Sequence, residues 1–142
     1  MWKYLNGKIS PVKEDVFKNT RINSLHVVGN NLLIGTNGKG LWRYDLISLD
    51  RLKQSNSITL NRILNIKSSL GDAFWVLTNG AIQKFILDEN TLLQIQAIDL
   101  RSQLELTEVI QIAEFKNKLY ILTKEGVSVF PAEKNKFQPT LQ

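Results

Sequence analysis

Short apolar runs alternate with turns along the whole chain, and three of these runs resemble one another. Each begins with four residues that are apolar or Gly, continues with Thr, passes through a turn and resumes with an apolar residue. The three copies span residues 32–41, 74–82 and 119–127, and their threonines are Thr36, Thr78 and Thr123. The threonines lie 42 and 45 residues apart, a spacing typical of a repeat unit of four β-strands.

The same pattern predicts an all-β chain that opens with a hairpin, strands 2–5 and 8–12 around the turn Asn6-Gly7, and a polar connector over 13–20. In the first unit the expected strands are 22–28, 32–36, 41–45 and one beginning at 47. In the second unit they are 63–67, 74–78, 81–87 and 92–98. In the third unit they are 109–115, 119–123, 127–130 and 136–138. Residues from 100 to the start of the third unit are read as a connector, because their apolar spacing does not continue at helical period.

The second strand of each unit is apolar at nearly every residue, so it has to be covered on both faces and the units are expected to stack. Alignment on the threonines brings similar residues together. The matched sets are Leu25, Ile66 and Ile112; Leu32, Phe74 and Leu119; and Tyr44, Phe85 and Phe130. Gly38, Gly80 and Gly126 fall in the hairpin turns, where a positive φ is expected.

Composition narrows the class of protein. A chain of 142 residues with 43% apolar and 22% charged residues is typical of one soluble globular domain. The absence of Cys excludes disulfides and thiolate metal sites, and a single His excludes a multi-His site. No apolar run is long enough for a membrane span, and the first residues are not a signal peptide. We therefore predict no membrane insertion in this segment.

The net charge of +5 is concentrated in residues 1–53, which carry nine Lys or Arg against four acids. The basic residues are scattered and not clustered, so a solvated surface is the preferred interpretation and no nucleic-acid partner is predicted.

No group of residues has the spacing of a catalytic site, so we predict that the chain is not an enzyme and has no catalytic residues, cofactor or metal. His26 lies on a predicted strand without a nucleophile or acid at motif spacing. Asp45, Asp72, Asp88 and Asp99 fall in or beside turns, where Asp favours local hydrogen bonds. The Gly-rich segment 35–40 lacks the Gly-Lys-Ser/Thr order of a phosphate loop.

Trp42 is the candidate for ligand binding. Its counterparts in the other units are Gln83 and Ser128, so the position need not be buried. With Lys39 and Arg43 nearby, Trp42 is expected to form a binding surface through stacking and anion contact.

The first copy also resembles a known family. Residues 22–25, 33–36, 40–41 and 44–45 follow the propeller repeat of two-component regulators, found in the sensor regions of bacterial hybrid histidine kinases. The other copies depart from it, with Leu77 and Leu122 where that repeat has Gly and Tyr120 where it has Trp. The resemblance covers roughly residues 1–138.

The resemblance implies an all-β propeller fold with an incomplete ring: a terminal hairpin and connector (1–20) and blades of four antiparallel strands at 21–60, 61–105 and 106–142. We expect a fragment of a larger protein, or a chain completed by partner chains. The implied function is a non-enzymatic, periplasmic sensing module for an oligosaccharide. The alternative hypothesis is a protein–protein interaction scaffold of self-associating blades. An enzyme of the propeller lyase or hydrolase type is disfavoured.

Overall fold

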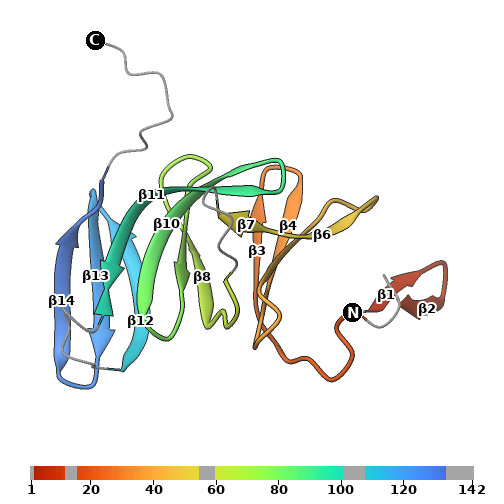
Figure 1. The fold of residues 1–142 in the computed structure, drawn as a ribbon, viewed down its shortest axis with the longest axis horizontal. Coiled ribbons are helices and arrows are strands. Elements are labelled where there is room, and N and C mark those ends of the chain that lie inside the picture. Colours follow the sequence, from red (N-terminus) through yellow and green to blue (C-terminus); the bar gives the residue numbers. More distant parts are fainter. Residues whose placement is uncertain (1, 12–15, 55–59, 101–107, 134–142) are drawn as a thin grey trace, which may run out of the picture.

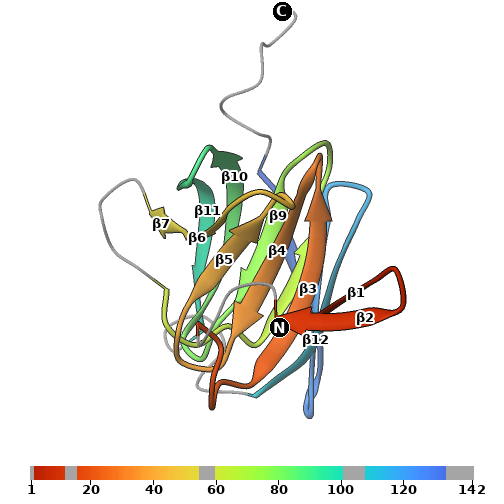
Figure 2. The ribbon, with the colours of Figure 1, turned by 90° about the vertical axis from the view of Figure 1, so that its right-hand side faces the viewer.

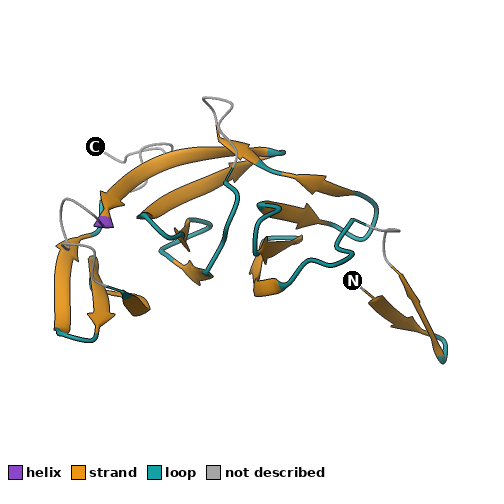
Figure 3. Ribbon diagram, turned by 60° about the horizontal axis from the view of Figure 1, so that its bottom comes forward, coloured by secondary structure: helices purple, strands orange, loops and turns teal. Residues whose placement is uncertain are grey.

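The computed structural model describes residues 2–11, 16–54, 60–100 and 108–133, and the all-β prediction is confirmed (Figure 3). Leu100, directly after the last strand of the second unit, has helical conformation. The strands are β1 (Trp2–Leu5), β2 (Lys8–Pro11), β3 (Ile22–Val28), β4 (Asn31–Thr36), β5 (Leu41–Tyr44), β6 (Leu49–Arg51), β7 (Lys53–Gln54), β8 (Asn65–Ser68), β9 (Phe74–Leu77), β10 (Ala81–Asp88), β11 (Thr91–Asp99), β12 (Val109–Phe115), β13 (Lys118–Thr123) and β14 (Gly126–Pro131).

These strands form a hairpin and three larger sheets (Figure 1). The hairpin pairs β1 with β2. Sheet 1 has the order β3-β4-β5-β6, sheet 2 the order β7-β11-β10-β9-β8, and sheet 3 the order β12-β13-β14. No sheet of the described residues closes on itself. The fourth strand expected at 136–138 lies outside the described residues.

The three threonines of the repeat perform the same task. The Thr36 hydroxyl donates a hydrogen bond to the carbonyl oxygen of Gly40 at 2.7 Å. The Thr78 hydroxyl donates to Ala81 at 3.3 Å and the Thr123 hydroxyl to Gly126 at 3.2 Å. Each hydroxyl thus ties the end of one strand to the start of the next, which explains why Thr recurs before each turn.

Two of the three predicted glycine conformations are confirmed. Gly38 has a φ of +114° and Gly126 a φ of +138°. Gly80 is not among the residues with positive φ, so the prediction is wrong there. The turn after Thr78 is a short one in which the Thr78 amide bonds the carbonyl of Ala81 at 3.0 Å, and it closes without a left-handed glycine.

The sheets stack face to face, and the core lies in the two contacts between them (Figure 2). One apolar cluster joins sheets 1 and 2 and includes Leu33, Leu41, Phe74, Val76 and Phe85. A second cluster joins sheets 2 and 3 and includes Trp75, Leu77, Ile112, Leu119 and Ile121. Strand β9 contributes to both clusters and is buried at all four residues, as its uninterrupted apolar run predicts.

The first strands of the units, β3, β8 and β12, lie at neighbouring edges of the three sheets, which fan outwards from them (Figure 3). Polar side chains join the first two of these strands. The Asn23 amide nitrogen donates to the carbonyl oxygen of Ile63 at 2.9 Å, and the Ser24 hydroxyl accepts from the Ile66 amide at 3.1 Å. The edges of sheets 1 and 2 are therefore held at a defined distance.

Two features of the fold were not predicted. Strand β7 leaves sheet 1 and pairs in parallel with β11, so that Lys53 lies opposite Thr91 in sheet 2. Burial of Leu52, which is 1% exposed, explains why the chain follows this path. In the polar connector after the hairpin, Phe17 is buried and its ring packs edge-on against Trp42, with the ring centroids 5.5 Å apart.

Candidate functional site

Trp42 and Lys39 attach the connector residues Val16, Phe17 and Lys18 to sheet 1. The Trp42 indole nitrogen donates to the carbonyl oxygen of Lys39 at 2.9 Å, and the ring packs on Phe17. The Lys39 ammonium group donates to the carbonyl oxygens of Val16 and Lys18 at 3.2 and 3.4 Å. Both side chains therefore have intramolecular partners.

Arg43 lies on the opposite face of sheet 1 from Trp42, because successive side chains of a strand alternate. Its guanidinium group donates to Asn90 and Asn31 at 2.9 Å each and pairs with Asp45 at 3.2 Å and Asp50 at 3.5 Å. The structure therefore does not bring Trp42 and Arg43 to one surface. Their role in ligand binding stays a prediction.

Asp45 makes the stability of the turn between β5 and β6 depend on pH. Its carboxylate accepts hydrogen bonds from the backbone amides of Ser48 and Ile47 and from Arg43, and these bonds lower the pKa of Asp45 from 3.8 to about 2. A carboxyl group whose pKa is lowered in the folded state contributes to the stability of the fold at pH values above its pKa in the unfolded chain. That contribution is lost as the pH falls from about 4 to about 2.

We expect the Asp45→Asn variant to be less stable than the parent chain near neutral pH and to approach it in stability as the pH falls to about 2, because Asn cannot ionise. Urea denaturation midpoints measured between pH 6 and pH 2.5 check this. Asp72→Asn, which changes an exposed carboxylate in another turn, is the control. An Asp45→Asn deficit that is constant with pH would contradict the expectation.

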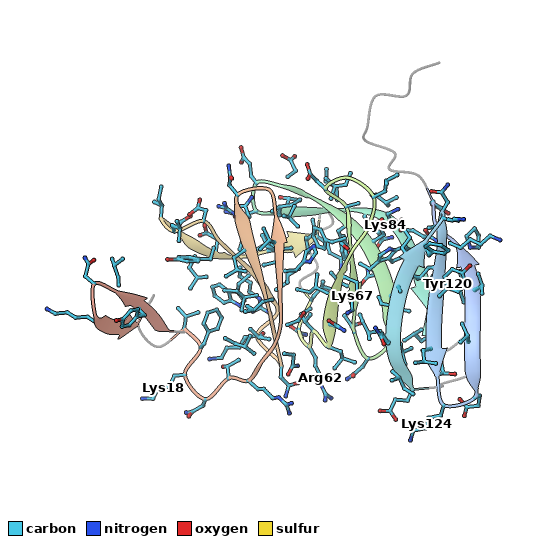
Figure 4. The ribbon with its side chains drawn as sticks, turned by 180° about the vertical axis from the view of Figure 1, so that it is seen from behind. Lys18, Arg62, Lys67, Lys84, Tyr120 and Lys124 are labelled. Carbon is cyan, nitrogen blue, oxygen red and sulfur yellow. The ribbon has the colours of Figure 1, made fainter. Side chains whose placement is uncertain are left out.

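A polar pocket lies where sheets 1 and 2 meet at their inner edges. It has a volume of about 330 Å³ and is lined by Arg21, Ile22, Asn23, Asn37, Arg62 and Leu64. The lining comes from the start of β3, the turn after β4 and the segment before β8. Arg62 lies at the lower edge of the molecule in Figure 4, in the segment before β8.

The backbone around the pocket is held by hydrogen bonds between the three segments. The Asn37 amide donates to the carbonyl oxygen of Arg21 at 2.9 Å, and Asn37 also forms an isolated β-bridge with Arg62. The Ile63 amide donates to the carbonyl oxygen of Thr36 at 2.8 Å. The two arginines are thus placed on neighbouring backbone segments of fixed geometry.

The charge of the pocket is unbalanced. Arg21 and Arg62 are both exposed, and within the described ranges neither forms an ion pair, so no acidic side chain there occupies their guanidinium groups. Guanidinium groups bind carboxylates and phosphates in bidentate fashion. The side-chain amide of Asn37 and the amide oxygen of Asn23, whose nitrogen donates to Ile63, supply hydrogen-bonding groups for hydroxyls. The pocket therefore has the chemistry of a site for a small hydroxylated anion.

Sequence reasoning missed this pocket because its residues lie far apart along the chain and in no motif. The excess of basic residues in 1–53, which includes Arg21, was the available signal. The other candidate, His26, is half-buried against the ring of Phe74 with the ring centroids 6.1 Å apart, and desolvation lowers its pKa. This is the position of a packing residue.

The described residues include no group of three or more His, Asp or Glu placed to hold a metal ion. Nor does any helix in the described ranges have the length and apolar character needed to cross a membrane. Comparison of the chain with models of protein families gave no match, and comparison with curated proteins gave none either.

Proposed function

We propose that this chain is a non-enzymatic ligand-binding module made of propeller blades, and that its ligand is a small acidic saccharide held in the pocket between Arg21 and Arg62. The blade assignment is supported by the repeated Thr turns and by the fan of sheets around β3, β8 and β12. In keeping with the repeat of two-component regulators, the proposed role is the sensing segment of a periplasmic sensor.

The observation that carries the proposal is the pair of arginines without acidic partners in the pocket, among the residues that the structure describes. An acidic sugar has a carboxylate for the guanidinium groups and hydroxyls for the amides of Asn23 and Asn37. The half-buried Ile22 and Leu64 supply the apolar part of the wall, against which the face of a sugar ring can lie.

We expect the amide signals of Asn23, Asn37 and Arg62 to shift when glucuronate oligosaccharides are titrated into the labelled full chain, monitored by NMR. Neutral glucose oligosaccharides of the same length should bind at least about tenfold more weakly. The Arg62→Ala variant should weaken binding by about 10–100-fold, because a hydrogen bond to a charged group contributes about 1.5–3 kcal/mol. Raising the ionic strength should weaken binding as well.

Lys116→Ala is the matched control, since it removes one exposed positive charge from the turn between β12 and β13, far from the pocket in the fold. It should leave the affinity unchanged. Equal losses in Arg62→Ala and Lys116→Ala, or shifts confined to residues outside the pocket, would contradict the proposed site.

A further inference from the structure

Each of the three sheets has an equivalent face that points toward the next unit of the repeat. In sheets 1 and 2 this face packs on the following sheet, and in sheet 3 it is the outer face. In β4, Leu33 and Gly35 face sheet 2, where a Cβ on Gly35 would lie 2.6 Å from Ile63 Cγ2. In β9, Trp75 and Leu77 pack in the cluster shared with sheet 3. The repeat places Tyr120 and Leu122 at the same positions of β13, at the end of the stack (Figure 4).

Strand register shows which residues share this outer face. Tyr120 lies opposite Ala113 and Val129, Leu122 lies opposite Val127, and Lys118 lies opposite Phe115 and Pro131. Val127 is 60% exposed and Phe115 is 61% exposed. We call this surface the outer face of sheet 3; its apolar members are Ala113, Phe115, Tyr120, Leu122, Val127, Val129 and Pro131, and its polar members are Gln111 and Lys118.

The outer face of sheet 3 also differs from its two equivalents in charge. Register makes Arg43 of β5, Lys84 of β10 and Val129 of β14 equivalent. Arg43 bonds Asn90 of the next sheet, and Lys84 bonds the carbonyl oxygen of Glu133 next to sheet 3. With Val129 in this place, the outer face of sheet 3 has no cation at the position of Arg43 and Lys84, and its one charged member is Lys118.

Sheet 1 carries the matching surface at the other end of the stack. The residue equivalent to Leu25 is Ile66 in sheet 2 and Ile112 in sheet 3, and these two are 4% and 1% exposed because each faces the preceding sheet. Leu25 itself is 59% exposed, and Val27 on the same side of β3 is 68% exposed. Phe17 packs on the neighbouring Ile34 and Trp42, while Leu25 and Val27 stay exposed among the described residues, and we call these two residues the open strip of β3.

We infer that the chain associates head to tail with a second copy of itself, the outer face of sheet 3 packing on the open strip of β3 in sheet 1. A second copy is the expected partner because the same contact occurs twice inside the chain. In each case the face of one sheet that corresponds to the outer face of sheet 3 packs on the face of the next sheet that corresponds to the open strip of β3. Both types are exposed among the described residues, one on sheet 3 and the other on sheet 1, beyond which the hairpin of β1 and β2 lies (Figure 1). Such a contact is heterologous, so it produces a closed ring or a filament.

Light scattering with size exclusion on the full chain tests this inference. We expect a mass of at least twice the 16.2 kDa of one chain. Leu122→Lys on the outer face of sheet 3 and Leu25→Lys on the open strip should each reduce the mass to that of one chain. The control Ile47→Lys replaces an apolar residue that is 94% exposed at the turn before β6, and it should keep the parent mass.

Mixing the two variants distinguishes a head-to-tail contact from a symmetric one. The mixture retains one intact pair of faces, so it should form a dimer with one copy of each variant and nothing larger. A parent chain that is monomeric up to about 100 µM, a concentration at which a contact with a micromolar Kd is formed, would overturn the inference. Dissociation by Leu122→Lys alone, with Leu25→Lys unaffected, would also overturn it. Circular dichroism checks that each variant is folded, and Val127→Lys replaces Leu122→Lys if that variant is not.

Discussion

Replacing Glu114 with alanine is expected to destabilise the chain by about 3–5 kcal/mol, because the change leaves a buried lysine without its counter-charge. The Lys84 side chain is 4% exposed and lies 3.6 Å from the Glu114 carboxylate, which is itself 11% exposed. The same carboxylate oxygen accepts from the Ser69 hydroxyl at 2.6 Å and from the Trp75 indole at 2.9 Å. One substitution thus removes the partner of three donors.

The Lys84 ammonium group keeps two contacts in this variant, a hydrogen bond to the carbonyl oxygen of Glu133 at 2.8 Å and a position 5.5 Å from the centre of the Trp75 ring. Neither contact carries a full negative charge, so the cost of burying the ammonium group is not offset. Figure 4 shows Lys84 between the strands of sheets 2 and 3. The destabilisation should therefore fall on the contact between these sheets.

Urea denaturation followed by circular dichroism measures this loss. Glu108→Ala is the matched control, since Glu108 pairs with Lys124 at 3.6 Å while both side chains are more than 70% exposed. An exposed pair contributes at most about 1 kcal/mol. The double variant Lys84→Met with Glu114→Leu should recover part of the loss, because both charges leave the interior together. Equal effects of Glu114→Ala and Glu108→Ala would refute the assigned role of the buried pair.

Gly40→Ala is expected to cost about 2–4 kcal/mol, the sum of backbone strain and a steric clash. Gly40 has a φ of +86°, and an added Cβ would clash with the Leu60 carbonyl oxygen and lie 2.8 Å from Arg51 Nε. The backbone of Gly40 cannot withdraw, since its amide donates to the carbonyl oxygen of Asn61 at 2.7 Å and its carbonyl accepts from Thr36.

Two further glycines separate the causes of this loss. Gly38→Ala introduces the strain of a φ of +114° but meets no atom within 4 Å, so it should cost less, about 1–2 kcal/mol. Gly80→Ala adds a Cβ in open space at a φ that L-residues adopt, and it should change the free energy of unfolding least. We expect the denaturation midpoint to fall most in Gly40→Ala, less in Gly38→Ala and least in Gly80→Ala. A loss in Gly80→Ala as large as that in Gly40→Ala would show that the clash is not the cause.

The sequence was informative wherever one residue type solves one local problem. Thr before each turn, an apolar second strand and the matched set of Leu25, Ile66 and Ile112 all mark the repeat, and the structure places them in equivalent positions. These are properties of a single strand or turn, so they can be read from the spacing of residues along the chain.

The predictions failed where distant segments meet. Residues 13–20 are mostly polar in sequence, so they did not indicate that Phe17 is buried, because its burial depends on contact with Trp42. The pairing of Lys84 with Glu114, thirty positions away in the chain, has no counterpart among the sequence predictions. The pocket combines residues from three separate segments, and the charge excess of the N-terminal third could not locate it. In each case the deciding contact is tertiary.

The crossing of β7 into sheet 2 has a consequence for how the chain comes apart. In a linear array of repeats, stability is the sum of each unit's own free energy and the coupling to its neighbours. Strand β7 directly continues sheet 1 in the chain but bonds β11, so sheet 2 cannot lose its outer strand without disturbing the end of sheet 1. Leu52, buried between the two sheets, adds to this coupling. The first two units are therefore expected to unfold as one cooperative block, separately from the third unit, whose described strands belong to sheet 3 alone.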